Sequence, residues 1–416
     1  MSASDKTTFI AAVRTAMQRG LYQVFVQIHA EAMTNKEAHG TCVFLFWHRR
    51  YILGFENMLR SLGPQFACIT LPYIDFVQVY LDYQAGLCNS LQECAVALLD
   101  LGGSTNGVSR PQTIFNKLVA SGTCVKSAPL DAFYDNSTVG DHCVSRGPWL
   151  SRAPPVGLSF ANIVARLFSF TDIKSMSAAI ESLPHNNLHN TLGGAMGSTT
   201  VSPSDPVFFL FHAFMDLLHS AFYRCLVLPQ KLTVDQKQSN VASFESCVSR
   251  NNEPIGPKSK IRMQYYTATG VLIDVTNPAS IVYPFFATIP NTYYELAEIP
   301  ALPQSYTYYV SGLLTRLFTQ CSSARARRLA ATQDHELIAP YRPQTLNYVS
   351  FQDDVTRRAA MTNSPDCDAK NEIIKMLLMH HDMCLADIED YSPEFKKEWR
   401  IQGKNVVVWV VISSLA

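Results

Sequence analysis

The sequence has no net charge that would direct it toward a charged partner. Its 34 lysines and arginines are balanced by 34 aspartates and glutamates, which argues against nucleic acid or an anionic membrane as the partner. No apolar run approaches the roughly 18 residues that a membrane-spanning helix requires, so no transmembrane segment is predicted. The opening MSASDKTTF lacks the apolar stretch of a secretory signal peptide, and no internal repeat is evident.

Core-forming residues and cysteines are plentiful by contrast. Hydrophobic residues make up 47% of the 416 positions and aromatic residues 11%, which is enough for two or three packed domains. Eleven cysteines are many for a reducing compartment. Four pairs are spaced like local bridges, although spacing does not fix connectivity: Cys88/Cys94, Cys124/Cys143, Cys225/Cys247 and Cys367/Cys384.

The cysteines and a glycosylation triplet at Asn136-Ser137-Thr138 favour the secretory pathway. We therefore predict a secreted protein whose leader is absent from this chain. A reduced, cytoplasmic protein is the alternative, because the odd number of cysteines leaves at least one thiol without an intrachain partner.

Two separated groups of three histidines are the most informative feature of the sequence. The second group is His185, His189 and His212. His185 and His189 are four residues apart, so they share one face of a helix. Gly193-Gly194 follow and are predicted to end that helix.

His212 is predicted to lie in a buried helix that begins near Asp205-Pro206, since aspartate caps helices and proline is favoured at the first position. The run around it is apolar on nearly all sides. Taken alone, such a residue is most simply a hydrogen-bonded core histidine. Two histidines just upstream favour a metal ligand instead. Asp216, one turn later, is predicted to support a ligand from behind.

The first group is His29, His39 and His48. His29 ends an apolar helical stretch, His39 falls in the polar loop NKEAHG, and His48 lies in a second helical stretch. Arg49 and Glu56 are predicted to form a buried pair that fixes this second helix. Three imidazoles leave an open coordination position, and two such sites facing each other would accommodate a two-atom ligand such as O2.

These motifs resemble those of the tyrosinase, catechol oxidase and hemocyanin superfamily, which has type-3 dicopper centres. AHGTCVFLFWHRRYILGFE resembles the first copper signature of the family, and HNNLH followed by DPVFFLFHAFMD resembles the second. LPYIDF is similar to the family's LPYWDW. The resemblance implies two copper ions, with O2 as cosubstrate. It places the first copper on His29, His39 and His48 and the second on His185, His189 and His212.

The chain departs from the family pattern at three places. Phe211 stands where many relatives have a histidine directly before the last ligand, and LPYIDF lacks both tryptophans, which changes packing more than chemistry. Glu37 stands two residues before His39, where many relatives have a cysteine thioether-linked to the ligand. Because Cys42 lies on the other side of His39, we predict no thioether.

The resemblance implies three candidate functions. Tyrosinases hydroxylate monophenols to o-diphenols and oxidise these to o-quinones, catechol oxidases perform only the second oxidation, and hemocyanins carry O2. In relatives with monophenolase activity, a glutamate and an asparagine at positions similar to Glu181 and Asn186 hold a water that deprotonates the phenol. This favours a tyrosinase acting on a small phenol. Alternatively, Glu181 only caps a short helix and Asn186 is only a polar residue of its first turn. For the chain as a whole, a further alternative is a relative that holds zinc in the same histidines and has no redox activity.

The predicted fold is mainly α, with a central helical bundle holding the dinuclear copper site and a smaller, β-containing C-terminal domain. We assign residues 1–310 to the catalytic domain, about 311–328 to a linker and 329–416 to a covering domain. Helices are predicted over 6–19, 91–101 and 159–170, and an irregular excursion over 103–157. Strands are predicted after about residue 228, as in IVYPFFATIP.

Three features near the end of the chain bear on this division. Arg325-Ala326-Arg327-Arg328 resembles a processing site, after which relatives lose a covering domain. Tyr306-Thr307-Tyr308 is a candidate for the Tyr-x-Tyr element that often closes the family's core, and VVVWVVISSLA is predicted to be a strand. The sequence does not determine the oligomeric state.

Overall fold

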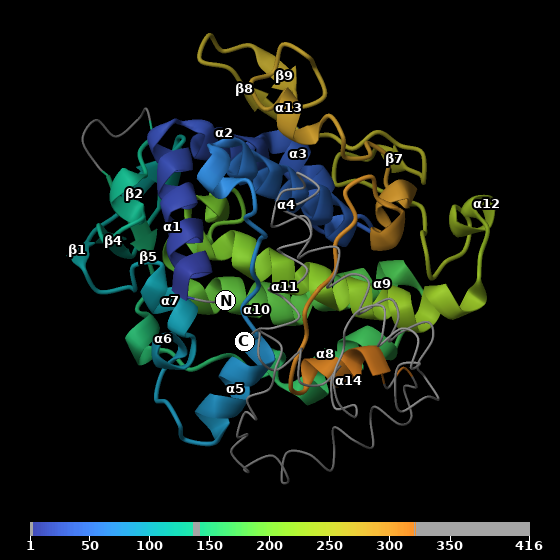
Figure 1. The fold of residues 1–416 in the computed structure, drawn as a ribbon, viewed down its shortest axis with the longest axis horizontal. Coiled ribbons are helices and arrows are strands. Elements are labelled where there is room, and N and C mark those ends of the chain that lie inside the picture. The colour runs from blue at the N-terminus through green and yellow to red at the C-terminus, as the bar shows by residue number, and fades with distance from the viewer. Residues whose placement is uncertain (1–2, 136–141, 320, 322–416) are drawn as a thin grey trace, which may run out of the picture. The chain divides into compact units, whose positions relative to one another are not determined.

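The computed structural model describes residues 3–135, 142–319 and 321 (Figure 1). Residues 7–305 and the described residues from 312 onward belong to one compact unit, whereas 3–6 and 306–311 are grouped with a second unit. Predictions for the Cys367/Cys384 pair, the basic run at Arg325, the covering domain and the glycosylation triplet lie outside the described residues.

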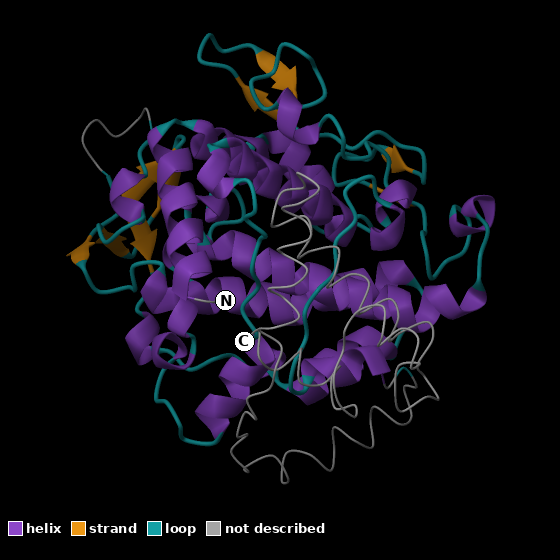
Figure 2. Cartoon of the chain, in the orientation of Figure 1, coloured by secondary structure: helices purple, strands orange, loops and turns teal. Residues whose placement is uncertain are grey.

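Two long helices form the centre of the larger unit. Helix α4 (Phe44–Ser61) and helix α11 (Val207–Phe222) pack extensively against each other. Helix α11 is buried along almost its whole length, as its apolar sequence predicts. Helices dominate the described residues (Figure 2), which confirms the mainly α fold.

Further helices surround this pair, and those predicted from the sequence are present. Residues 91–101 form two short helices because the chain leaves the helical conformation at Ala95. The remaining α-helices are α1 (Ala3–Gln18), α2 (Leu21–Ala30), α3 (Ala32–Ala38), α5 (Phe76–Gln84), α6 (Leu91–Cys94), α7 (Val96–Asp100), α8 (Phe160–Phe168), α9 (Ile173–Ile180), α10 (Asn186–Leu192), α12 (Val234–Lys237), α13 (Tyr283–Phe286) and α14 (Leu314–Thr319).

The strands are short, antiparallel and partly misplaced by the sequence prediction. The excursion over 103–157 contains a sheet of order β1-β4-β5 and the pair β2-β3, while IVYPFF forms helix α13 and no strand. Strands of two or three residues carry no readable periodicity. They are β1 (Gly107–Ser109), β2 (Gln112–Ile114), β3 (Lys117–Val119), β4 (Thr123–Val125), β5 (Val144–Arg146), β6 (Cys247–Val248), β7 (Pro254–Ile255), β8 (Gln264–Tyr266) and β9 (Leu272–Asp274).

Four disulfides are defined among the described residues. Cys88–Cys94 and Cys124–Cys143 confirm two of the pairs expected from spacing. The third expected pair is wrong, because Cys225 bonds Cys321 and Cys247 bonds Cys42. Neither partner is close in sequence, so spacing alone could not reveal it. Within the described residues, no helix combines the length and apolarity needed to cross a bilayer.

The predicted Arg49–Glu56 pair is also wrong. The guanidinium of Arg49 donates to Asp216 of α11 at 2.5 Å, and both side chains are buried. Glu56 instead pairs with Arg60, one turn along α4, at 3.0 Å. Arg49 therefore joins the two central helices to each other, because its side chain faces the neighbouring helix.

Candidate metal centre

The first histidine group comes from three consecutive elements. His29 lies in the last turn of α2, His39 follows the end of α3, and His48 lies within α4. In each ring, Nδ1 lies within hydrogen-bond distance of a backbone carbonyl oxygen, which only accepts, so Nδ1 carries the proton and Nε2 keeps its lone pair. The accepting oxygens belong to Thr200, Asn35 and Phe44, at 2.9, 3.1 and 2.8 Å respectively.

The second group is held by three elements. His185 ends a π-helical turn, η5 (Glu181–His185), and His189 lies in α10, which ends at Gly193 with a φ of 59°. His212 lies in α11. The Nδ1 of His185 bonds the side-chain oxygen of Asn186 at 2.9 Å, and that of His189 bonds the carbonyl oxygen of Met196 at 2.7 Å.

Each group brings its ligand atoms together. Within both triplets, one ring nitrogen from each histidine lies within 4.8 Å of the other two. The rings of His48 and His212, one from each group, stack with centroids 4.3 Å apart. The two predicted ligand sets are therefore each assembled, and they lie side by side.

The protonation state of these histidines suits metal binding. Burial lowers the pKa of all six imidazoles, to about 4 for His39 and His189. The buried Nε2 atoms of His29, His48 and His185 have no hydrogen-bond partner among the described residues. A buried lone pair left unsatisfied is costly unless something binds it. Neutral imidazoles in two sets of three fit a pair of copper ions, each with an open coordination position.

Aromatic rings pack around the two histidine groups. Phe208 stacks on His212 with centroids 4.0 Å apart, and Phe211 stacks on His185 at 5.4 Å. Phe211, which replaces the histidine common in relatives, therefore packs against a ligand. Such contacts restrict the rotation of the imidazoles and exclude water from the site.

Asp216 contacts the site through another residue. Its carboxylate bonds Arg49, which directly follows His48 in α4 and also donates to the carbonyl oxygen of Leu296 at 2.6 Å. The Nδ1 of His212 has no hydrogen-bond partner among the described residues. Support of a ligand by Asp216 stays a prediction, and the bond to Arg49 is the route by which it would act.

Glu181 and Asn186 lie on either side of His185 in the chain, and each makes one defined polar contact. Glu181 is buried, and its Oε1 accepts from the backbone N–H of Gly40 at 2.8 Å. Burial raises the pKa of Glu181 to about 7, although the Gly40 N–H opposes the shift. Asn186 accepts from His185. Glu181 thus contacts the residue after His39, and Asn186 contacts His185 itself. Their role in holding a water stays a prediction.

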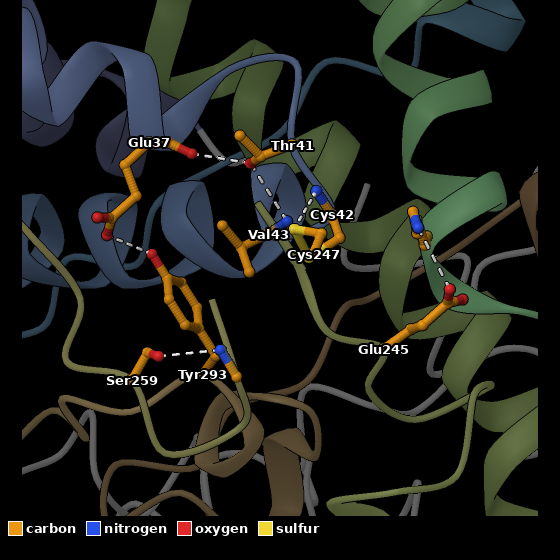
Figure 3. The surroundings of a disulfide bond; sticks show 10 residues. Glu37, Thr41, Cys42, Val43, Glu245, Cys247, Ser259 and Tyr293 are labelled. Atoms are coloured by element: carbon orange, nitrogen blue, oxygen red, sulfur yellow. Dashed lines mark hydrogen bonds and ion pairs between the residues drawn. A yellow bond between two sulfur atoms is a disulfide. The ribbon is translucent and has the colours of Figure 1, made fainter. Parts of the chain in front are cut away.

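The structure adds contacts that the sequence did not indicate. Glu37, which stands where relatives have the thioether cysteine, is buried and accepts from the hydroxyl of Tyr293 at 2.5 Å (Figure 3). Cys42 is used in its disulfide with Cys247. No sequence signal points to partners more than two hundred residues away.

The fold and the site define a helical protein with a centre for two metal ions, each facing three imidazoles. A family profile described as the common central domain of tyrosinase matches residues 19–224, which include all six histidines. Through this domain the chain belongs to the tyrosinase family of type-3 copper proteins. The resemblance seen in the copper motifs is thereby confirmed.

The relatives differ in how much of their length the chain covers. A tyrosinase from Streptomyces glaucescens is 28% identical over 54% of this chain and 80% of its own length. Tyrosinase HcTyr1 from a Hahella species is 30% identical over 44% of this chain but only 37% of its own length. Among solved structures, a functional unit of octopus hemocyanin is similar at 16% identity with a TM-score of 0.45, covering 81% of this chain and 72% of that one.

Proposed function

We propose that the chain is a tyrosinase, which hydroxylates monophenols to o-diphenols with O2 and oxidises these to o-quinones. The observation that carries the proposal is the buried carboxyl group of Glu181, four residues before His185 and bonded to the residue after His39. The Glu181 side chain thus connects the segment that carries His185 to the residue next to His39. Relatives named as tyrosinases support the same assignment.

The side chains have separate tasks in this proposal. The six neutral imidazoles hold the copper pair, which when bound supplies the activation of O2. The Gly40 N–H holds Oε1 of Glu181, so Oε2 is assigned to a water shared with Asn186. In the metal-free chain, burial raises the pKa of Glu181 to about 7, which makes its carboxylate a stronger base than that of an exposed glutamate for taking the phenol proton through this water.

Two alternative functions fit the same histidines. A catechol oxidase would oxidise diphenols and leave monophenols untouched, and a hemocyanin-like protein would bind O2 reversibly without oxidising either. Neither alternative needs a buried carboxyl group beside His185. The position of Glu181 therefore favours the tyrosinase.

One assay separates the three functions. The copper-loaded protein, with metal content measured, is given tyramine, tyrosine and catechol in turn. We expect about two coppers per chain and oxidation of all three substrates. Oxidation of catechol alone would identify a catechol oxidase, and two coppers with no turnover would identify an O2 binder. A single tightly held zinc would contradict the copper assignment.

The disulfides bear on the place where the protein works. Bonds such as Cys88–Cys94 and Cys124–Cys143 persist in oxidising compartments. We therefore propose a secreted protein. Detection of the protein in reduced form in the cytoplasm would contradict this.

We also propose that residues 329–416, which follow the predicted linker, cover the site until they are removed. The basis is the basic run Arg325-Ala326-Arg327-Arg328 at the predicted linker. Cleavage after Arg328, or exposure to mild detergent, is expected to raise the turnover of catechol several-fold. Equal kcat and KM before and after cleavage would exclude latency.

A further inference from the structure

The loop that carries His39 is attached to distant parts of the chain. This loop, residues 39–43, joins α3 to α4. Cys42 is bonded to Cys247 in β6, and its backbone N–H points to the sulfur of Cys247 at 3.2 Å. The side chain of Arg250 packs over Gly40, so that a Cβ at this glycine would lie 3.2 Å from it. The segment 247–250 therefore lies directly against the loop.

A second attachment lies at the other end of the loop. Glu37, two residues before His39, accepts from the hydroxyl of Tyr293 at 2.5 Å and from the backbone N–H of Arg262 at 2.8 Å. Both Glu37 and Tyr293 are buried. The backbone carbonyl of Glu37 in turn accepts from the hydroxyl of Thr41 at 2.8 Å, inside the loop (Figure 3).

The nearby contact that orients His39 comes from a short helix: the carbonyl oxygen of Asn35 in α3 lies 3.1 Å from the Nδ1 of His39. Helix α3 has only seven residues, and a helix this short is unstable without tertiary contacts. His39 itself is in an extended conformation, and Gly40 has a φ of 65°. Glycine adopts this left-handed conformation at little cost, but it has no side chain that could pack against His39.

We propose that the Cys42–Cys247 disulfide and the Glu37–Tyr293 hydrogen bond act together as a clamp that positions His39 for the first copper. The four residues are positioning residues, since none of them supplies a ligand atom. The inference rests on the copper centre described above and extends it to a part of the chain outside the tyrosinase domain, which ends at residue 224.

The clamp makes a selective prediction about the two copper ions. Loosening His39 weakens the first site, whereas His185 and His189 are oriented by Asn186 and Met196, which the clamp does not touch. Loss of a group that orients a metal ligand typically lowers metal affinity about 10–100-fold. One copper should therefore leave before the other.

The test uses two clamp variants with matched controls in the full chain. Tyr293→Phe removes one buried hydroxyl, and Cys42→Ser with Cys247→Ser removes the disulfide. Tyr265→Phe is the control for the first, because the Tyr265 hydroxyl is also buried and bonds Ser280, at 3.0 Å, and not a residue of the clamp. Cys88→Ser with Cys94→Ser is the control for the second.

Copper-loaded proteins are dialysed against increasing concentrations of a chelator, and copper per chain is measured. The clamp variants should fall from two coppers to one at chelator concentrations about 10–100-fold lower than the controls. The copper left behind should become visible by electron paramagnetic resonance, because a lone Cu(II) ion has no second ion to couple with. If both clamp variants keep two coppers as tightly as their controls, the clamp is refuted.

A measurement without metal separates this inference from the proposed function. In the metal-free protein, amide hydrogen exchange over residues 39–43 should be faster in both clamp variants than in the controls, with unchanged exchange in α11. Unchanged exchange in the loop would overturn the clamp even if copper binds. A wild-type chain that binds no copper would refute the proposed function, while the exchange result would still decide whether the loop is clamped.

Discussion

The two histidine groups have the same ligands but different kinds of support. In the second group, two of the three imidazoles are oriented by Asn186 and Met196, which lie one and seven residues from the histidines they contact. In the first group, His39 and His48 are likewise oriented by carbonyl oxygens four residues away. His29, however, is oriented by the carbonyl oxygen of Thr200, 171 residues away, and the His39 loop is tied to Cys247.

The two groups therefore differ in how far along the chain their supporting residues lie. The second group is largely encoded in one continuous stretch, so it depends on few other parts of the chain. The first group depends on distant segments through His29 and the His39 loop, and it is therefore exposed to substitutions far from the three histidines. The buried Arg49–Asp216 pair joins the two groups, because it links the helix of His48 to the helix of His212.

The largest expected effect comes from removing one ligand on each side of the comparison. His48→Ala and His212→Ala should each abolish oxidation of catechol and tyramine, because each leaves one copper with two imidazoles. Metal analysis should show about one copper per chain in either variant. Full activity in one of them would show that the two groups do not form one centre.

The next effect concerns the carboxyl group of Glu181, which accepts from the residue after His39. Glu181→Gln should lower turnover of tyramine roughly 10²–10⁴-fold, because it removes the base that the phenol needs. Turnover of catechol should change much less, since a diphenol is more acidic and binds copper through two oxygens. Steady-state kinetics on both substrates checks this. Equal losses would make Glu181 a structural residue that only holds Gly40.

The link between the two groups is tested by stability. Asp216→Leu leaves the guanidinium of Arg49 buried without its carboxylate and should lower the free energy of unfolding by about 3–5 kcal/mol. The double variant Arg49→Met with Asp216→Leu should lose less, because no charge is left unpaired. Denaturant titration of the metal-free proteins measures both. Equal losses in the single and double variants would show that packing, and not the ion pair, joins the helices.

The smallest expected effect tests whether the second group is held by its neighbours in the chain. Asn186→Ala removes the acceptor that orients His185 and should lower the affinity of the second copper about 10-fold, leaving the first copper unchanged. Asn187→Ala is the matched control, one residue further along α10. Chelator titration compares the two. A loss from the first site in the Asn186 variant would contradict the separation of the two groups.

Much of the centre was predictable because its signals are local. The spacing of His185 and His189, the glycines that end α10, and the apolar run around His212 each depend on neighbours in the chain. The helices over 6–19 and 159–170 were predictable for the same reason, since an amphipathic or apolar period is visible over several turns.

The tertiary structure alone decided how these local pieces are joined. It paired Arg49 with Asp216 and not with Glu56, because a buried guanidinium bonds whichever carboxylate packs against its helix. It also directed Cys247 to Cys42 and not to Cys225.

The sequence by itself predicted which six histidines gather into two sets of three, since they lie in recognisable motifs. The tertiary structure alone brought Tyr293 to Glu37 and Cys247 to Cys42, the contacts on either side of His39. The physical reason is that hydrogen bonds and disulfides form between groups close in space, and a linear sequence records that closeness only for near neighbours.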